Sequence, residues 1–513
     1  MWEEAISDLE RRREEAKQGG GKARIKKQYA AGKLTARDRI EMLLDDGTFV
    51  EVNDLVEGRI DDFDLAKKRI PGDGVVTGYG KINGRQVFVS SEDFTVIGGT
   101  LGEYHSMKIQ NIMDMAVNMR APFISINDSG GARIEEGIDS LSGYGGMFLR
   151  HTRASGVIPQ IAVILGPCSG GACYAPAICD FIFMVRKTSK MFITGPQVVK
   201  TVIGEETTVE ELGGADVHAE KSGVSHFTYD DEKECFEGVR NLLSYLPQNN
   251  KAKLPVVKGK PQDLSDKLTS IVPDNKRRIY DVHAVIETMI DKGSFMEVQE
   301  RFAQNAVVGF GRMDGETIGF VANQPCVLGG SLDVDSSDKM ARFIRFCDCF
   351  RIPLVTLVDV PAFMPGTVQE HAGIIRHGAK MLYAFSEATV PKVTLIMRKA
   401  YGGAYIAMNS KNMGADVVYA WPIAEIAVMG ADGAVNIIAR KQIEAAENPE
   451  EERKRLKDEY EEKFANPYIA AKRGFVDEVI KPSETRDMIR KALDALKEKK
   501  IDKIYKKHGN IPL

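Results

Sequence analysis

A duplication decides the fold of this chain: Gly78-Tyr79-Gly80-Lys81-Ile82-Asn83-Gly84 recurs as Gly309-Phe310-Gly311-Arg312-Met313-Asp314-Gly315, 231 positions later. The same separation relates Gly-Gly-Thr-Leu at 98–101 to Gly-Gly-Ser-Leu at 329–332, and it still holds at Asp128 and Asp359. A repeat this long lies far outside the periods of solenoid proteins, so it indicates two domains of one fold in a single polypeptide.

The repeat extends further towards the N-terminus and leaves a gap in the middle of the chain. A block at residues 45–52 matches residues 291–298 at a different offset, and residues 247–275 are enriched in proline, asparagine and lysine. Such a composition is typical of an interdomain linker. We therefore expect an N-terminal domain over residues 1–255 and a C-terminal domain over residues 256–513.

The sequence of each half predicts the order of its strands and helices. Asn83-Gly84 and Asp314-Gly315 are strong hairpin-turn dipeptides between apolar segments, and strands then alternate with helices. This alternation predicts α/β domains with right-handed crossovers. The helices are expected at residues 101–119 and 338–350, and the buried strands at residues 123–126, 161–165, 354–358 and 393–397.

The composition narrows the functional classes. A net charge of -4 does not indicate the excess of basic residues that is typical of nucleic-acid-binding proteins. No stretch reaches the ~18 apolar residues that span a bilayer, and the charged start lacks a signal-peptide core, so a cytoplasmic protein is expected. Seven cysteines contain no Cys-x-x-Cys pair and the histidines form no ligand spacing, which argues against a disulfide framework and a metal site.

Two glycine pairs occupy matching places in the halves. Gly170-Gly171-Ala172 and Gly402-Gly403-Ala404 each follow a predicted strand and precede a predicted apolar helix. Glycine lets the backbone approach a ligand closely, and the first turn of a helix supplies unpaired N–H groups that favour a developing oxyanion. Close helix packing also explains a single such pair, but two pairs in register favour chemistry. A second donor loop should face each pair, at residues 128–133 and 359–366.

At these residues the chain resembles the biotin-dependent acyl-CoA carboxyltransferases, in particular the β subunits of propionyl-CoA carboxylase and the carboxyltransferase subunits of methylmalonyl-CoA decarboxylase. The similarity runs from about Gly19 to the last residue. The motifs that carry it are Ser129-Gly130-Gly131-Ala132-Arg133-Ile134-Glu135-Glu136-Gly137, Gly166-Pro167-Cys168-Ser169-Gly170-Gly171-Ala172, Arg376-His377-Gly378-Ala379-Lys380 and Lys399-Ala400-Tyr401-Gly402-Gly403-Ala404-Tyr405.

The resemblance implies two tandem crotonase-like domains, a hexamer built as a trimer of dimers, and transfer of a carboxyl group between carboxybiotin and the α-carbon of an acyl-CoA. It implies that the first half holds the thioester enolate, the second half holds the biotin ureido oxygen, and each active site is shared between two subunits. The implied catalytic residues are Gly131, Ala132, Gly171, Ala172, Ala362, Phe363, Gly403 and Ala404. The implied substrate-binding residues are Gly130, Gly170, Gly402, Tyr405 and Ile406.

The chemistry agrees with this assignment and limits what the chain does alone. Two carbonyl oxygens gain negative charge during transfer, one on each substrate, so a duplicated domain suits the reaction. The glycine-rich residues 72–80 lack the Lys-Ser/Thr ending of a phosphate loop. ATP chemistry therefore belongs to partners, and we expect a biotin carboxylase and a biotin carboxyl carrier subunit, with biotin on the carrier.

Several alternatives stay open. The resemblance places Ile406 where many propionyl-CoA carboxylase β subunits have an acidic residue and several decarboxylase-type relatives do not, so a sodium-pump decarboxylase with a membrane subunit is one alternative. A crotonase-type hydratase or isomerase would need an acidic pair such as Glu135 and Glu136, which helix electrostatics also explain. A non-catalytic scaffold is the third. His377 is interpreted as a structural or interface residue.

Overall fold

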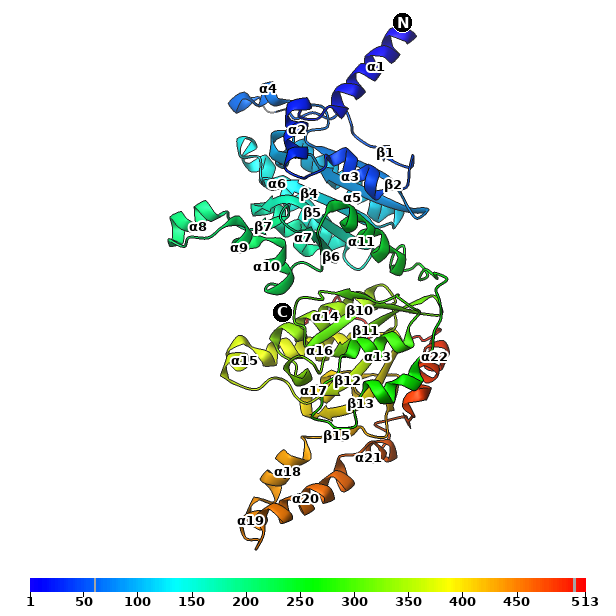
Figure 1. The fold of residues 1–513 in the computed structure, drawn as a ribbon. Helices are drawn as coiled ribbons and strands as arrows, with labels where there is room; N and C mark the ends of the chain where they lie inside the picture. Colours follow the sequence, from blue (N-terminus) through cyan, green and yellow to red (C-terminus); the bar gives the residue numbers. More distant parts are fainter. Residues whose placement is uncertain (60, 502–503) are drawn as a thin grey trace. The chain divides into compact units, whose positions relative to one another are not determined.

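The computed structural model describes residues 1–59, 61–501 and 504–513. The chain separates into two compact units, Met1–Lys253 (unit 1) and Leu254–Leu513 (unit 2). Each unit is built around its own eight-stranded sheet with helices packed against it (Figure 1).

The sheet of unit 1 is antiparallel at one edge and parallel elsewhere. The first three strands pair antiparallel, and every later pair is parallel. In spatial order the strands are β1 (Val50–Glu51), β2 (Val75–Ile82), β3 (Arg85–Glu92), β4 (Phe123–Ser129), β5 (Gln160–Ser169), β6 (Phe181–Val185) and β8 (Phe227–Tyr229), with β7 (Lys190–Phe192) paired to the end of β5.

The sheet of unit 2 repeats this order strand for strand. Its antiparallel edge and parallel remainder match those of unit 1. The strands are β9 (Met296–Val298), β10 (Ala306–Met313), β11 (Glu316–Asn323), β12 (Leu354–Val360), β13 (Lys392–Tyr401), β14 (Val417–Ala420) and β16 (Glu478–Val479), with β15 (Glu425–Ala427) paired to the end of β13.

Fine details of the two sheets confirm the duplication. The pairing of β4 with β5 shifts register between Asn127 and Ser129, and that of β12 with β13 shifts between Val358 and Val360, 231 residues later. The predicted turns are present in both units, because Ile82 pairs with Arg85 and Met313 with Glu316. The α/β fold with an internal repeat is therefore confirmed.

Helices cover the sheets in the order that the sequence predicts, with shifted boundaries. The helix expected at 101–119 is α5 (Glu103–Met119), and the one expected at 338–350 is α14 (Val334–Cys349). The predicted start of α14 was wrong because Asp333 forms a capping box with Ser336, which begins the helix five residues after Gly329 rather than at Asp338. Thr35 and Asp38 likewise form a capping box at the start of α3 (Ala36–Leu43).

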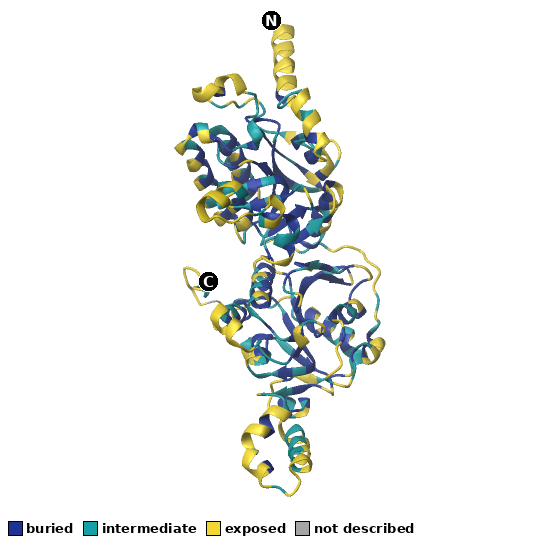
Figure 2. Ribbon diagram, turned by 60° about the vertical axis from the view of Figure 1, so that its left-hand side comes forward, coloured by how far each residue is buried: buried dark blue, intermediate teal, exposed yellow. Residues whose placement is uncertain are grey.

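The core of each unit lies between its sheet and amphipathic helices. On α5 the buried residues Ile109, Ile112, Met113 and Ala116 recur at helical spacing and share one cluster with Phe123 of β4. Figure 2 shows the buried strands inside each unit and exposed helices at the surface. The remaining helices of unit 1 are α1 (Trp2–Lys17), α2 (Lys22–Ala30), α4 (Leu65–Lys68), α6 (Ile138–Ala154), α7 (Tyr174–Ile178), α8 (Pro196–Ile203), α9 (Val209–Gly213), α10 (Ala215–Glu220) and α11 (Glu232–Tyr245).

Unit 2 begins earlier than the composition suggests. The linker was expected to run to residue 275, but Val256 already bridges to Glu316, and the buried Leu268 opens α12 within the core. The remaining helices of unit 2 are α12 (Leu268–Ile271), α13 (Val282–Met289), α15 (Thr367–Ala372), α16 (Ile374–Glu387), α17 (Gly402–Ala407), α18 (Ala431–Ile438), α19 (Arg440–Glu444), α20 (Pro449–Phe464), α21 (Pro467–Lys472) and α22 (Thr485–Ala495). Within the described part of the chain, none of the helices has the length and apolar character needed to cross a bilayer.

Candidate active site

In unit 1 the first glycine pair lies where β5 gives way to a single 3-10 turn, Gly170–Cys173. Gly170 has a φ of 62°, a left-handed conformation that glycine adopts without strain. Gly171 has ordinary helical geometry and is partly exposed. The N–H groups of Gly171 and Ala172 stand in the first turn, where a helix leaves its amides unpaired. They can therefore donate to a ligand.

The facing loop of unit 1 is held by a parallel bridge between Leu101 and Ala132. The N–H of Leu101 donates to the carbonyl of Gly131 at 2.9 Å, and that of Arg133 donates to the carbonyl of Leu101 at 2.9 Å. In this pattern the intervening amide of Ala132 points away from Leu101. The N–H of Gly131 is directed to Oγ of Ser129 at 3.2 Å. Ala132 is thus the free donor of this loop, and Gly131 is not.

Unit 2 repeats both features. Leu332 bridges to Phe363, with its N–H donating to the carbonyl of Ala362 at 3.0 Å, so the amide of Phe363 points away from Leu332 as that of Ala132 does from Leu101. At the end of β13, Gly402 has a φ of 56° and α17 begins, placing the amides of Gly403 and Ala404 in a first turn.

The two glycine sites differ in the space around them. A Cβ added to Gly171 would lie 2.9 Å from the ring of Tyr144, whereas one added to Gly403 would meet nothing within 4 Å. Gly171 is therefore fixed by close packing, and Gly403 borders open space. Near Gly403, Tyr405 is half-buried and Ile406 is 45% exposed.

The helices that follow the glycine pairs are short. The 3-10 turn of unit 1 has four residues and leads into a five-residue helix, while α17 has six. A short helix has few aligned peptide dipoles, so individual amides dominate the electrostatics of each site.

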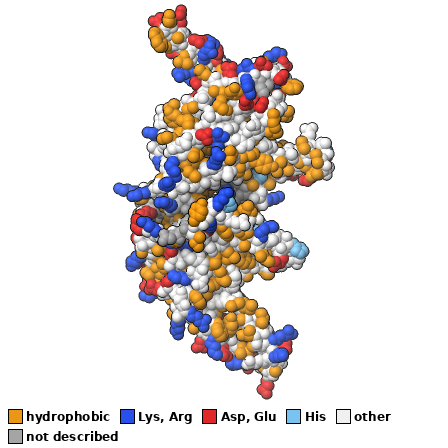
Figure 3. All heavy atoms as spheres, turned by 180° about the vertical axis from the view of Figure 1, so that it is seen from behind, with side chains coloured by type: hydrophobic (Ala, Val, Ile, Leu, Met, Phe, Trp, Pro, Cys, Tyr) orange, Lys and Arg blue, Asp and Glu red, His pale blue; other side chains and the backbone are white. Residues whose placement is uncertain are grey.

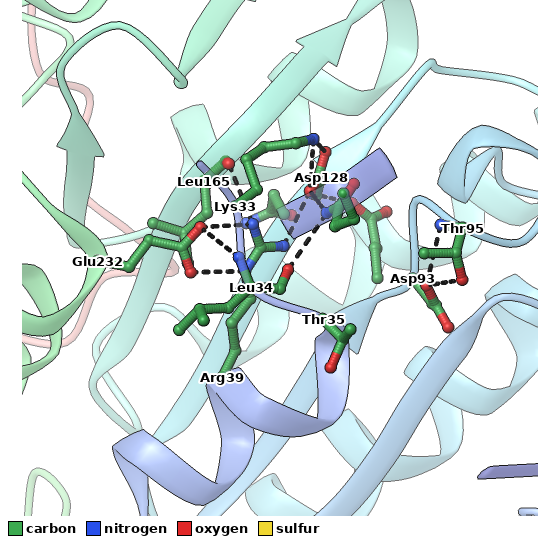
Figure 4. A network of polar contacts seen from close by, with 12 residues as sticks. Lys33, Leu34, Thr35, Arg39, Asp93, Thr95, Asp128, Leu165 and Glu232 are labelled. Carbon is green, nitrogen blue, oxygen red and sulfur yellow. Dashed lines mark hydrogen bonds and ion pairs between the residues drawn. The ribbon is translucent and has the colours of Figure 1, made fainter. Parts of the chain in front are cut away.

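A buried polar network supports the donor loop of unit 1 (Figure 4). Asp128 is the penultimate residue of the buried strand β4, and its carboxylate accepts from Lys33 at 2.9 Å, Gln28 at 3.0 Å and Arg39 at 2.9 Å. Arg39 also forms two bonds with Glu232, of 2.9 and 2.7 Å. Because these groups are buried and mutually paired, they hold the strand end in one position.

In unit 2 a single cationic side chain, that of Arg398, neutralises the equivalent carboxylate. The Asp359 carboxylate, equivalent to Asp128, accepts from Nε of Arg398 at 2.9 Å and from the amide of Lys399 at 3.0 Å. The pairing of β12 with β13 and that of β4 with β5 show that Arg398 is the equivalent of Gly166 in unit 1. Gly166 leaves no room for a side chain, because a Cβ added to it would lie 1.9 Å from the carboxylate of Asp128. The two units therefore neutralise the equivalent carboxylates from different directions.

Residues that could have served as side-chain acids or bases have structural partners. Glu136 is buried, pairs with Arg133 at 2.6 Å and accepts from the amide of Glu103 at 2.6 Å, which caps α5. His377 bonds to Asp338 at 2.8 Å on the surface of unit 2. Among the described residues, no group of three or more His, Cys, Asp or Glu side chains is arranged to bind a metal ion.

Three residues that support the unit 1 site were not assigned this role from the sequence. Tyr144 packs against Gly171, Ser129 ties the amide of Gly131, and Glu92 accepts from the amide of Asp128. The role of Tyr144 could have been predicted from its place among the glycines of residues 143–146 on α6, because a large ring among small residues indicates close packing against another element. The other two contacts depend on side-chain directions that no local pattern reveals.

Comparisons with known proteins agree over nearly the whole chain. The chain is 57% identical to the propionyl-CoA carboxylase carboxyltransferase subunit of Haloferax mediterranei, covering 100% of this chain and 99% of that one. It is 55% identical to the methylmalonyl-CoA decarboxylase subunit alpha of Propionigenium modestum, covering 99% of both. The transcarboxylase 12S crystal structure, described as a hexamer assembly with methylmalonyl-coenzyme A and methylmalonic acid bound, superposes with a TM-score of 0.97 at 50% identity, covering 99% of this chain and 98% of that one.

The family model described as the carboxyl transferase domain matches residues 27–511. Together with the identity to these relatives, this match settles the family: the chain belongs to the carboxyl transferase domain family.

Proposed function

We propose that the chain is the carboxyltransferase subunit of a biotin-dependent enzyme that moves a carboxyl group between carboxybiotin and the α-carbon of propionyl-CoA. The observation that carries the proposal is the pair of equivalent amide sites in the duplicated units, Ala132 with Gly171 and Phe363 with Gly403. The names of the relatives, which include propionyl-CoA carboxylase and methylmalonyl-CoA decarboxylase subunits, support this substrate class.

In this proposal unit 1 binds the CoA thioester. The amides of Ala132 and of Gly171 or Ala172 donate to the thioester oxygen as it gains charge in the enolate. Each such donor typically lowers a barrier by about 2.7 to 4 kcal/mol, more than most single contacts. Gly130 and Gly170 let the backbone approach the thioester, because neither carries a side chain.

Unit 2 binds biotin, which is carried on a separate protein. The amides of Phe363 and of Gly403 or Ala404 fit a ureido oxygen, and the open space beside Gly403 admits a ring. Carboxybiotin supplies the carboxyl group and, after losing it, a basic ureido nitrogen for the α-proton. No side-chain base is then required, which agrees with the structural roles of Glu136 and His377.

We further propose that each active site is shared between two subunits of a hexamer. The solved transcarboxylase 12S is described as a hexamer, which supports this assembly. Exposed apolar side chains on unit 2 also favour a contact with another subunit, including Ile437 and Ile438 on α18, which are 67% and 70% exposed. Figure 3 shows hydrophobic side chains gathered over the helical end of unit 2.

The partners in this proposal are a biotin carboxylase and a biotin carboxyl carrier subunit in the cytoplasm. All seven cysteines are free thiols, and five are buried, which suits a reducing compartment. A membrane decarboxylase subunit is the alternative partner, favoured by the 55% identity to a methylmalonyl-CoA decarboxylase subunit. A membrane protein that co-purifies with the native complex distinguishes the two settings.

One assay separates this function from its rivals. The purified chain is incubated with methylmalonyl-CoA and biocytin without ATP, and propionyl-CoA is measured. We expect propionyl-CoA only when biocytin is present. Hydration of crotonyl-CoA at a comparable rate would instead identify a crotonase-type hydratase, and unchanged thioesters in every mixture would identify a scaffold.

A further inference from the structure

In unit 1 the end of β4 is held by a side chain from the neighbouring strand. The pairing of β3 with β4 ends at Ile126, and the pairing of β4 with β5 passes from Asn127 directly to Ser129. Asp128 therefore has no partner residue in either of these ladders. Its main-chain N–H donates instead to Oε2 of Glu92, which follows the last paired residue of β3, at 2.9 Å.

The donor loop of unit 1 begins at this residue. Asp128 precedes Ala132, whose amide is the free donor of the loop, by four positions. The loop between them is short and tied, because the N–H of Gly130 donates to the carbonyl of Gly98 at 2.9 Å. The position of the Ala132 amide therefore depends on where the amide of Asp128 is held, and Glu92 holds it.

The geometry places one proton between Glu92 and His105. Nδ1 of His105 lies 2.9 Å from the carbonyl oxygen of Asp73, which can only accept, so this nitrogen carries the hydrogen. In the neutral ring Nε2 is then an acceptor, and among the described residues it has no hydrogen-bond partner. Oε1 of Glu92 lies 3.7 Å from it. A shift of about 1 Å brings the two atoms to bonding distance, and a proton on either one makes the contact favourable.

The pair is buried among groups that do not titrate near neutral pH. Burial raises the pKa of Glu92 to about 8. The titratable and charged groups that face Glu92 are Asp128 of β4, Arg39 of α3, His105 of α5, Tyr144 of α6 and Cys168 of β5. The Asp128 carboxylate raises the pKa of Glu92 and the Arg39 guanidinium lowers it. Burial raises the pKa values of Tyr144 and Cys168, so both stay neutral.

The charged groups that face His105 are matched by other partners. Asp73 pairs with Arg133 at 2.8 Å, and Nζ of Lys108 donates to the carbonyl of Gly72 at 2.8 Å. These contacts fix the three charges in place on the side of the ring that carries Nδ1. The proton between His105 and Glu92 is therefore the one that can leave this region as the pH rises.

Unit 2 makes the same main-chain bond without an ionisable group. The side-chain oxygen of Asn323 accepts from the amide of Asp359 at 2.9 Å, and its nitrogen donates to the carbonyl of Asp359 at 2.6 Å. The 231-residue separation places Ser336, which caps α14, at the position of His105. The fold does not require an acid here, and the acid and the imidazole occur together only in the unit proposed to bind the thioester.

We propose that Glu92 is a positioning residue for the thioester site, which holds the amide of Ala132 in place only while it shares a proton with His105. This inference rests on the proposed function of unit 1. Release of the proton to solvent leaves a buried carboxylate beside the lone pair of Nε2 and near the carboxylate of Asp128. Repulsion between these groups moves Glu92, the amide of Asp128 moves with it, and Ala132 is withdrawn from the enolate oxygen.

The test compares the pH profile of the wild type with that of Glu92→Gln, using full-length protein, methylmalonyl-CoA and saturating biocytin. Glutamine keeps an oxygen for the amide of Asp128 but cannot ionise. The ratio of wild-type kcat to variant kcat should therefore fall about tenfold per pH unit above the pKa of Glu92. The change should lie in kcat more than in KM, because the Ala132 amide donates most strongly to the charged enolate. Glu41→Gln, an exposed acid on α3, is the matched control and should follow the wild type.

Two further measurements separate positioning from a loss of structure. Glu92→Leu removes the acceptor as well as the charge and should lower kcat about tenfold or more at every pH. Thermal melting at each pH shows which proteins remain folded. Infrared difference spectroscopy of the wild type against Glu92→Gln detects the protonated carboxyl group without substrate, and its band should be present at pH 7 and lost above about pH 8.

Parallel kcat profiles for the wild type and Glu92→Gln would overturn the proposal. So would a difference confined to KM, or a wild type that shows no carboxyl band at pH 7. A wild type without carboxyltransferase activity would instead contradict the proposed function, and the infrared band would still test the shared proton.

Discussion

The main-chain N–H of Asp128 donates to Oε2 of Glu92 at 2.9 Å, and at the equivalent place in unit 2 the N–H of Asp359 donates to Oδ1 of Asn323, also at 2.9 Å. Glu92 thus occupies the position that the neutral side chain of Asn323 occupies in unit 2. Its full burial raises its pKa to about 8, because desolvation disfavours the carboxylate. Nε2 of the buried His105, whose pKa burial lowers to about 4, lies 3.7 Å from Oε1 of Glu92.

Glu92→Gln should therefore change how stability depends on pH. Between the ordinary pKa of 4.5 and about 8, folded Glu92 holds a proton that the unfolded chain has released, so the free energy of unfolding falls as the pH rises. Glutamine does not titrate and so removes this loss, and between pH 4.5 and pH 8 the variant should gain roughly 4 kcal/mol of stability relative to the wild type. Melting temperatures across pH 5 to 9 measure the difference. Parallel curves for the two proteins would show that Glu92 does not titrate in this window.

Arg39→Met should destabilise unit 1. It leaves Glu232 buried without its guanidinium partner and takes one of three donors from Asp128, so we expect a loss of roughly 3 to 5 kcal/mol. Arg12→Met removes an exposed pair with Asp8 and is the control, expected to leave urea unfolding unchanged. Equal unfolding midpoints for both variants would contradict a supporting role for the network.

The sequence predicts repeating features well and side-chain contacts poorly. The duplication, the turns at Asn83-Gly84 and Asp314-Gly315, and the alternation of strands and helices along the chain follow from local patterns that recur. The start of α14 was mispredicted because Asp333 caps it from outside the apolar pattern. That the amide of Gly131 is tied to Ser129, leaving Ala132 free, follows only from three-dimensional contacts.

Ile406→Asp tests whether this side chain borders the acyl group. Ile406 is 45% exposed beside Gly403, so the substitution should be tolerated by the fold. If Ile406 contacts the acyl chain, the ratio of kcat/KM for propionyl-CoA over acetyl-CoA should change, since one methylene in an apolar pocket is worth about 1 to 3 kcal/mol. An unchanged ratio in a folded variant would place Ile406 away from the acyl group.

Complementation tests whether sites are shared between subunits. Gly171→Val should block the thioester site and Gly403→Val the biotin site, so each variant alone should be inactive. Co-expressed at equal amounts, half of the dimers are mixed, and each mixed dimer has one intact site if sites form between chains. About a quarter of wild-type activity should then return. Inactive mixed dimers, verified by tagged purification, would show that each site lies within one chain.

The folding of these variants needs its own control. The added side chain of Gly171→Val meets the ring of Tyr144, whereas that of Gly403→Val faces open space. Gly130→Val, whose added Cβ meets Thr100 at 3.4 Å, is a second unit 1 variant for the same experiment. Thermal melting before mixing identifies any chain that has lost its fold.

The most direct measurement compares wild type with Gly403→Val in the conversion of methylmalonyl-CoA to propionyl-CoA, with and without biocytin and without ATP. Two cooperating amide sites predict turnover by the wild type only with biocytin, and no turnover by Gly403→Val although it still binds the thioester. Biocytin-independent turnover, or full activity in the variant, would contradict the carboxyltransferase account.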